Sequence, residues 1–168
     1  MRSRSATLAD AASIARIYNE GIEDRLATFE TRLRTEEDAR SWLTGEYPIV
    51  VVEDATHIIA FASTSQYRPR DCYSGIAEFS VYVARQARGR GAGRKALDAL
   101  LREAEDAGFW KLLSRIFVEN VASRALMRSA GFREVGVYEK HAMLDGVWRD
   151  VVIVEKLLSG DQVPPLHP

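Results

Sequence analysis

A glycine-rich turn, Arg88–Gly93, between a strand pattern and a helix pattern constrains this fold more than any other feature. Residues Ile76–Val83 alternate as a strand does, and Ala92–Ala107 repeats apolar residues at helical spacing up to Gly108. Another strand pattern follows at Leu112–Val118. A helix that joins two such strands is typical of a crossover between parallel strands. The sequence therefore predicts an α/β fold with a parallel strand pair.

The remaining strand patterns are those of antiparallel neighbours. Pro48 introduces the β-branched run Ile49–Val52, and a turn at 54–56 leads back into a second run at 58–63. Asp145-Gly146 is a strong hairpin signal near the other end. We predict a mixed α/β fold whose twisted, mostly antiparallel central sheet has about seven strands and carries helices on both faces. The other predicted elements are a weak first strand, helices near 8–22 and 35–43, a short helix Ser123–Ala130, and strands Phe132–His141 and Val147–Leu158.

Length and composition indicate one ordinary domain. The chain has 168 residues, so we assign 1–158 to a single domain and 159–168 to an irregular, proline-containing tail. The 23 Lys and Arg nearly balance 24 Asp and Glu, which argues against nucleic-acid and membrane partners. Cys72 is the single cysteine and no apolar run approaches the ~20 residues of a membrane helix, so we expect a cytoplasmic protein. The three histidines lack metal-ligand spacing, and no metal is expected.

The turn Arg88–Gly93 is a candidate phosphate site. Glycines leave backbone N–H groups accessible, and the helix that follows adds four unpaired N–H groups and the positive end of its dipole. Two other interpretations stay open, namely a flexible loop without a ligand and a dinucleotide fingerprint, since Gly91–Ala96 reads G-x-G-x-x-A. We rank the dinucleotide interpretation second, because Glu119, the acid that closes the next strand, lies too far along the chain.

One face of the strand Ile76–Val83 is polar. Alternation places Glu78, Ser80 and Tyr82 on the face opposite Phe79. Central strands covered on both faces are normally apolar on both, so this pattern indicates either a face open to water or a cavity. We favour the cavity, because the strand leads directly into the glycine turn. Glu78 is then a candidate general base.

With these motifs in place, the sequence resembles the GNAT superfamily of N-acetyltransferases over nearly its whole length. Arg88–Gly93 matches the superfamily's R/Q-x-x-G-x-G/A acetyl-CoA loop, and Asn120 opens its N-x-x-A/S-x-x-L-x-x-x-x-G-F segment. Within the superfamily, the chain is most similar to the phosphinothricin, arsinothricin and methionine sulfoximine acetyltransferases. The segments Leu26–Glu30, Ala77–Val83 and Gly146–Val151 carry that similarity.

The resemblance implies direct transfer of an acetyl group from acetyl-CoA to the α-amine of a small acidic amino-acid analogue, a detoxifying reaction. It also implies that Glu78 is the general base and that the protein is a homodimer. The position at which many members carry a tyrosine acid is Met127 here, and neither Tyr82 nor Tyr138 is assigned that role. The implied acetyl-CoA contacts are Val81, Tyr82, Val83, Arg88, Gly89, Arg90, Gly91, Ala92, Gly93, Arg94, Asn120 and Ser129.

The substrate side is implied by the same subfamily. Arg68 and Arg70 precede the catalytic strand, where the subfamily grips the acidic groups of its substrate, and Phe29 is expected to wall the pocket. Alternatives remain for each, because the two arginines also suit a solvated loop and Phe29 also suits the core. A dinucleotide- or acyl-CoA-binding module without acetyl transfer is the alternative function.

Overall fold

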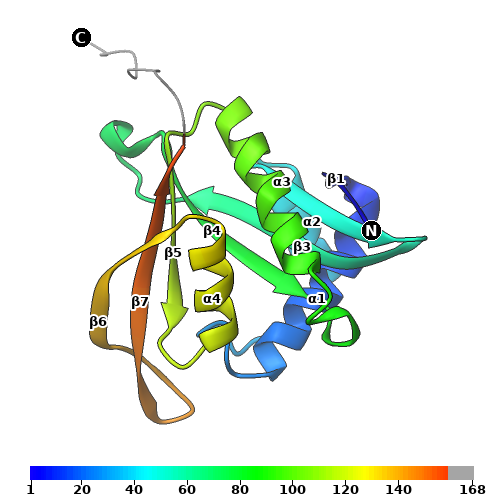
Figure 1. Ribbon diagram of the computed structural model, residues 1–168. Coiled ribbons are helices and arrows are strands. Elements are labelled where there is room, and N and C mark those ends of the chain that lie inside the picture. The colour runs from blue at the N-terminus through cyan, green and yellow to red at the C-terminus, as the bar shows by residue number, and fades with distance from the viewer. Residues whose placement is uncertain (159–168) are drawn as a thin grey trace.

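The computed structural model describes residues 1–158, which form one seven-stranded sheet (Figure 1). The strand order across the sheet is β1-β2-β3-β4-β5-β7-β6, and within the described chain β4–β5 is the only parallel pair. The expected tail at 159–168 lies outside these residues. The strands are β1 (Arg2–Ser5), β2 (Ile49–Asp54), β3 (His57–Gln66), β4 (Ile76–Val83), β5 (Lys111–Phe117), β6 (Arg133–Leu144) and β7 (Val147–Leu157).

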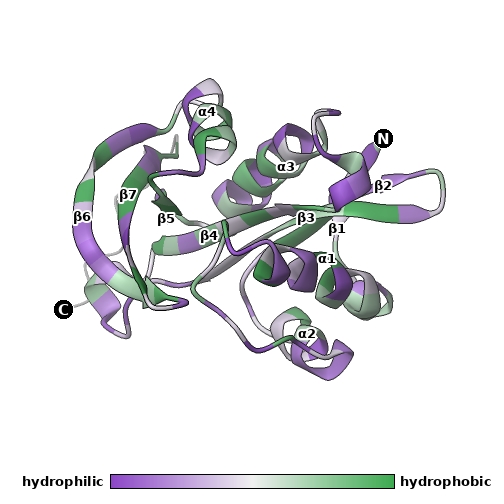
Figure 2. Ribbon diagram, turned by 90° about the horizontal axis from the view of Figure 1, so that it is seen from below, coloured by the Kyte–Doolittle hydropathy of each residue, from purple (hydrophilic) through white to green (hydrophobic). Residues whose placement is uncertain are grey.

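Helices cover both faces of the sheet. Figure 2 shows α3 and α4 on one face and α1 and α2 on the other. The mixed, mostly antiparallel fold predicted from the sequence is therefore confirmed, and so is the order of its helices and strands. The helices are α1 (Ala11–Glu23), α2 (Glu36–Leu43), α3 (Ala92–Asp106) and α4 (Val121–Ser129), with single 3₁₀ turns at Leu8–Asp10, Asp71–Tyr73 and Arg85–Ala87.

Carboxylates fix the start of the first two helices. The Asp10 carboxylate accepts a hydrogen bond from the Thr7 N–H (2.8 Å), and the Asp38 carboxylate accepts one from the Thr35 N–H (2.8 Å). Asp10 is also buried and accepts two hydrogen bonds from the Arg4 guanidinium, at 2.8 and 2.9 Å. The bonds from Arg4 lower the pKa of Asp10, with further help from Thr7.

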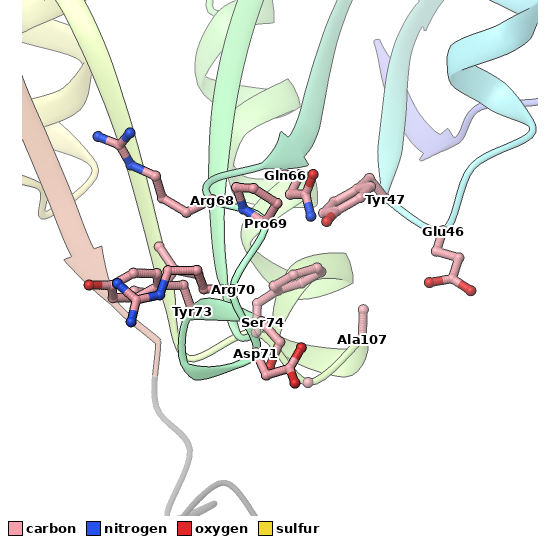
Figure 3. Close-up of a pocket in the computed structure, with 13 residues that line it drawn as sticks. Glu46, Tyr47, Gln66, Arg68, Pro69, Arg70, Asp71, Tyr73, Ser74 and Ala107 are labelled. Carbon is pink, nitrogen blue, oxygen red and sulfur yellow. The ribbon is translucent and has the colours of Figure 1, made fainter.

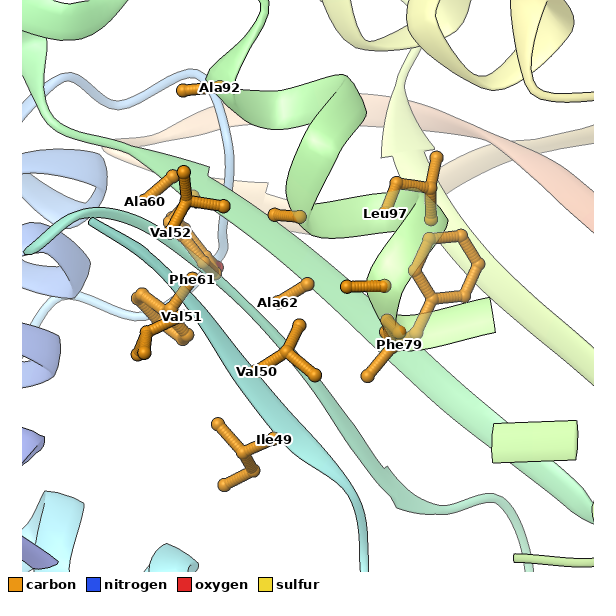
Figure 4. Packing of buried hydrophobic residues seen from close by; sticks show 14 of the residues in the cluster. Ile49, Val50, Val51, Val52, Ala60, Phe61, Ala62, Phe79, Ala92 and Leu97 are labelled. Carbon is orange, nitrogen blue, oxygen red and sulfur yellow. The ribbon is translucent and has the colours of Figure 1, made fainter. Parts of the chain in front are cut away.

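The core fills the space between the sheet and its helices. Strand β2 is buried on both faces at Ile49–Val52, as expected for a strand covered by helices on each side. Leu97 of α3 packs over the sheet beside Phe79 of β4 (Figure 4). The largest fully buried side chains include Phe61, Ile14, Ile17, Ile22, Leu97, Leu100 and Leu112. This packing holds β4, the strand that carries the candidate base, between two helical layers.

The neighbouring strands β4 and β5 pair over only part of their length. Their parallel register covers Ile76–Glu78 against Lys111–Leu113. Beyond that point β4 continues along β3 as far as Val83, whereas β5 continues along β7 as far as Phe117. Each strand follows its other neighbour, so the two diverge (Figure 1). The result is a wedge in the middle of the sheet that begins just after Glu78.

Two absences hold for residues 1–158. No helix there is both long and apolar enough to cross a membrane. Nor do these residues contain a group of three or more His, Cys, Asp or Glu side chains placed to hold a metal ion.

Candidate active site

A cavity of about 660 Å³ lies on the sheet face next to the wedge. Glu78, Ser80 and Tyr82 of β4 all line it, so the polar face of this strand borders a cavity. A narrower space of about 50 Å³ runs into the wedge itself and shares Ser80 and Arg115 with the larger cavity. A ligand held in the wedge and a ligand held in the cavity would therefore meet beside Glu78.

Glu78 occupies the last paired position of β4 before the wedge opens. Its side chain is 26% exposed, and its Oε1 atom accepts a hydrogen bond of 2.5 Å from Nη2 of Arg115 on β5. Opposite Glu78 on the other side lies Ser65 of β3, which also lines the cavity. The carboxylate is thus both reachable and held by one cation, as a general base that must accept a proton from a ligand requires.

Tyr82 is the buried end of this polar face. Its ring packs against Tyr18 of α1 at 4.8 Å and stacks on Phe61 at 5.4 Å. Burial raises the pKa of the Tyr82 hydroxyl well above its ordinary value, and the charge on Tyr18 raises it further. The phenol is consequently a weak proton donor.

The backbone of β4 directs alternate N–H groups toward the wedge. The N–H of Ala84, directly after the strand, bonds to the carbonyl of Ile59 in β3 at 2.9 Å. Since alternate N–H groups of a strand point to opposite neighbours, those of Val81 and Val83 point toward β5, while that of Tyr82 points toward β3. Two of the three backbone positions expected to contact acetyl-CoA therefore turn their N–H groups into the wedge.

A strap formed by residues 25–34 crosses over the cavity and is tied down at both ends. At one end, Asn120 donates from Nδ2 to the carbonyl of Leu26 (3.1 Å). At the other, Asn19 exchanges two hydrogen bonds, of 2.9 and 2.8 Å, with the backbone of Arg34. Phe29 in the middle of the strap lines the cavity, and its ring also packs edge-on against Phe117 at 4.7 Å. Phe29 therefore both lines the cavity and packs against a neighbouring ring, so its position fits both interpretations.

The glycine turn presents bare backbone ahead of α3. Gly89 and Gly91 have φ angles of +73° and +83°, and a Cβ atom at either position would meet nothing within 4 Å. Gly91 is the N-cap of α3, and no side chain caps the first N–H groups of the helix. At Gly93 a Cβ would lie 3.2 Å from Val83 Cγ2, so glycine here allows α3 to approach β4. An open backbone turn at a helix N-terminus fits the diphosphate of acetyl-CoA.

The arginines around this turn are all paired with acids. Their guanidinium groups are about half exposed, and each forms one close ion pair, so their positive charge is compensated locally. Arg94 also donates to the carbonyl and hydroxyl of Ser129, which brings these two expected acetyl-CoA contacts together. The pairs are Arg88–Asp24 (2.6 Å), Arg90–Asp54 (2.9 Å) and Arg94–Asp98 (2.8 Å).

Asn120 caps the N-terminus of α4 beside the wedge. Its Oδ1 atom accepts a hydrogen bond from the Ser123 N–H (3.1 Å), which makes it the N-cap of α4 and explains why this helix begins at Val121, two residues before the predicted start. Asn120 and Met127 both line the narrow space in the wedge, and Met127 is 3% exposed. The residue in the usual tyrosine position is therefore an apolar wall of the wedge.

Arg68 and Arg70 border a different cavity, of about 470 Å³. Figure 3 shows them on one side of that cavity, with Tyr47 and Glu46 on the other. Arg70 lies over the ring of Tyr73 at 5.9 Å. The hydrogen bond to Tyr67 raises the pKa of Arg68. Neither arginine lines the Glu78 cavity itself.

Sequence reasoning missed Arg115, which contacts Glu78 directly. A signal for it was present, because Arg115 is a charged residue inside the otherwise apolar strand pattern Leu112–Val118. Other residues that line the same cavity and carry polar groups are Tyr18, Thr28, Glu30, Arg32 and His141.

Three features define the class of this protein: the wedge between β4 and β5, the glycine turn, and a cavity lined by a carboxylate. Residues 14–132 match the Acetyltransferase (GNAT) family, and the chain belongs to that family. It is accordingly an acetyl-CoA-dependent N-acetyltransferase rather than a dinucleotide-binding protein.

The relatives of this chain narrow the class further. The phosphinothricin N-acetyltransferase of Streptomyces coelicolor is 31% identical, over 89% of this chain and 91% of its own. The L-methionine sulfoximine/L-methionine sulfone acetyltransferase of Salmonella typhimurium is 29% identical over 98% of each chain. The crystal structure of a phosphinothricin acetyltransferase from Sinorhizobium meliloti, in complex with AcCoA, is 31% identical with a TM-score of 0.86, covering 94% of this chain and 88% of its own. The chain therefore falls within this subfamily.

Proposed function

We propose that this enzyme acetylates the α-amine of a small amino-acid analogue with an acidic or acid-like side chain, such as phosphinothricin, arsinothricin or methionine sulfoximine. The observation that carries the proposal is the position of Glu78, at the point where the wedge meets the 660 Å³ cavity. Relatives that are named for phosphinothricin and methionine sulfoximine support this choice of substrate.

On this proposal the wedge and the glycine turn hold the cofactor. Acetyl-CoA supplies the acetyl group as a thioester. The open backbone of Gly89 and Gly91, at the N-terminus of α3, binds its diphosphate. The N–H groups of Val81 and Val83 are positioned to donate to the carbonyl oxygen at which negative charge develops.

Glu78 prepares the amine. An amino acid's ammonium group is mostly protonated at neutral pH and is not nucleophilic, so a base has to accept a proton before attack. The carboxylate of Glu78, which is partly exposed in the cavity, accepts it directly or through water. Phe29 closes the apolar side of the cavity, and Arg68 and Arg70, which line the other cavity, are the proposed partners of the substrate's acidic side chain.

The test is a substrate panel with the base removed. The release of free CoA is measured with phosphinothricin, arsinothricin, methionine sulfoximine and ordinary amino acids. Glu78→Gln should lower kcat by roughly 10²- to 10⁴-fold for the preferred amine, the usual contribution of a general base. Glu37→Gln, at an exposed position of α2, is the matched control and should keep wild-type turnover. Near-wild-type turnover by Glu78→Gln would refute the role of the base.

A homodimer is also part of the proposal. Strand β6 lies at the edge of the sheet, and large apolar side chains on the β6–β7 hairpin are about half exposed. Such an edge needs a partner to cover it, and a second copy is the partner that the resemblance implies. Light scattering should give twice the chain mass for the wild type and for Leu8→Lys, but the chain mass for Val137→Lys. The exposed side chains are Val135, Val137, Tyr138, Met143, Val147 and Trp148.

A further inference from the structure

Most of the hydrogen-bonding capacity of Arg115 is unused within residues 1–158. It projects from β5 into the cavity and is 41% exposed. Its hydrogen bond to Glu78 uses Nη2, and within residues 1–158 the guanidinium makes no other hydrogen bond or ion pair. Most of its donors are therefore available to a ligand.

The other charged groups around the cavity have partners of their own. Arg32 on the strap pairs with Asp38 at 3.3 Å, and Glu30 pairs with Arg34 at 2.5 Å. His141 lines the cavity from β6, and Tyr18 lines it from α1. Arg115 is the cation whose single partner is the candidate base itself.

That pairing leaves both groups able to take a second partner. Arg115 engages Oε1 of Glu78 through Nη2, and a carboxylate has a second oxygen and about four acceptor sites, so Glu78 can still accept a proton from an amine. Because Arg115 is 41% exposed and lines the cavity, a ligand there can reach its remaining donors. An anionic group suits those donors, since the guanidinium forms its strongest hydrogen bonds with oxyanions.

An α-amino acid carries the complement of this ion pair. Its ammonium nitrogen and its carboxylate carbon are about 2.5 Å apart, since both are bonded to the same Cα. Arg115 lies in hydrogen-bond contact with Glu78, so an amine held at Glu78 carries its α-carboxylate within reach of the guanidinium. The positive group of the ligand then meets Glu78, and the negative group meets Arg115.

We propose that Arg115 binds the α-carboxylate of the substrate and so places the α-amine beside Glu78. The inference rests on the proposed function and deepens it. Arg115 recognises the group that all α-amino acids share.

The test compares one substrate with and without its α-carboxylate. Phosphinothricin and its decarboxylated analogue, 3-aminopropyl(methyl)phosphinate, are assayed with the wild type, Arg115→Gln and Arg115→Lys. Arg115→Gln should raise KM for phosphinothricin on the order of 10- to 100-fold, the usual effect of losing a charged hydrogen bond, and leave KM for the analogue unchanged. Arg115→Lys keeps the charge and should recover part of the loss. Arg40→Gln, which removes an arginine from the exposed side of α2, controls for net charge.

Two results would overturn the assignment. An equal rise in KM for both compounds would mean that Arg115 only shapes the cavity, and an unchanged KM for phosphinothricin would mean that it does not touch the substrate. Calorimetry separates these results from a failure of the proposed function. If the wild type acetylates neither compound, the function is refuted, and the binding of phosphinothricin to CoA-loaded wild type and Arg115→Gln still decides the role of Arg115.

Discussion

Gly91→Ala tests whether the turn before α3 holds the cofactor through its backbone. Gly91 has a φ angle of +83°, and its added Cβ would meet no protein atom within 4 Å. The folded protein therefore pays only backbone strain, about 1–2 kcal/mol for a non-glycine residue in this region. For a chain of this length, each kcal/mol lowers Tm by about 2–4 °C, so we expect a Tm that is lower by about 2–8 °C.

The effect on the cofactor should be larger than the effect on the fold. A methyl group on Gly91 occupies the open space in which the diphosphate is expected to lie. Losing one hydrogen bond from a backbone N–H to a charged phosphate costs about 1.5–3 kcal/mol, which corresponds to an increase in KM of about 10- to 150-fold. We expect that increase for acetyl-CoA and a smaller one for the amine.

Gly108 at the opposite end of α3 provides the matched control. Its φ is +89°, and a Cβ there would also meet nothing within 4 Å, so Gly108→Ala carries the same strain away from the turn. Initial rates of CoA release over a range of acetyl-CoA concentrations, with thermal unfolding of each variant, give both quantities. If the two variants lose the same Tm and keep the same KM for acetyl-CoA, the turn does not bind the cofactor.

Two further predictions concern stability. In Gly75→Ala, the new Cβ would lie 1.9 Å from the ring of Trp110. We therefore expect the free energy of unfolding to fall by about 1–3 kcal/mol and Tm to fall by about 2–12 °C. Gly136→Ala, whose Cβ would meet no atom within 4 Å, is the control and should keep the wild-type Tm. Arg4→Gln removes the main cause of the lowered pKa of Asp10, so chemical unfolding should show a loss of roughly 1.5–3 kcal/mol at neutral pH. A lowered pKa contributes its full stabilisation above the unfolded value near 4 and loses it as the pH falls through the lower folded value. The loss caused by Arg4→Gln should therefore shrink as the pH falls below about 4, and a loss independent of pH would contradict the assignment.

The parts of the fold that depend on local pattern were predictable from the sequence. Alternation along Ile76–Val83 and helical spacing along Ala92–Ala107 each depend on residues a few positions apart, and both elements appear where they were expected. The capping residue Asp38 is also a local signal. The polar side of β4 indicated either a cavity or a face open to water, and the cavity was favoured because the strand leads into the glycine turn; Glu78, Ser80 and Tyr82 do line a cavity.

The parts that depend on distant partners were not predictable. The wedge exists because β4 follows β3 while β5 follows β7, and no local pattern in either strand records that choice. The ion pair between Glu78 and Arg115 joins residues on two strands separated by the whole crossover helix. The acids that neutralise the turn also come from distant elements, as Asp24 does for Arg88.

The departing thiolate is the remaining chemical requirement of the proposed reaction. Met127 occupies the position of the usual acid and is buried, so it offers no proton. Burial raises the pKa of Tyr82, which makes that phenol a worse donor than free tyrosine, and Tyr138 is half exposed on β6 and does not line the Glu78 cavity. A thiol with a pKa near 8.5 leaves as the anion without help at neutral pH. The proposed reaction therefore needs proton transfer at the amine, beside Glu78 and Arg115, and does not need an acid at the leaving thiolate.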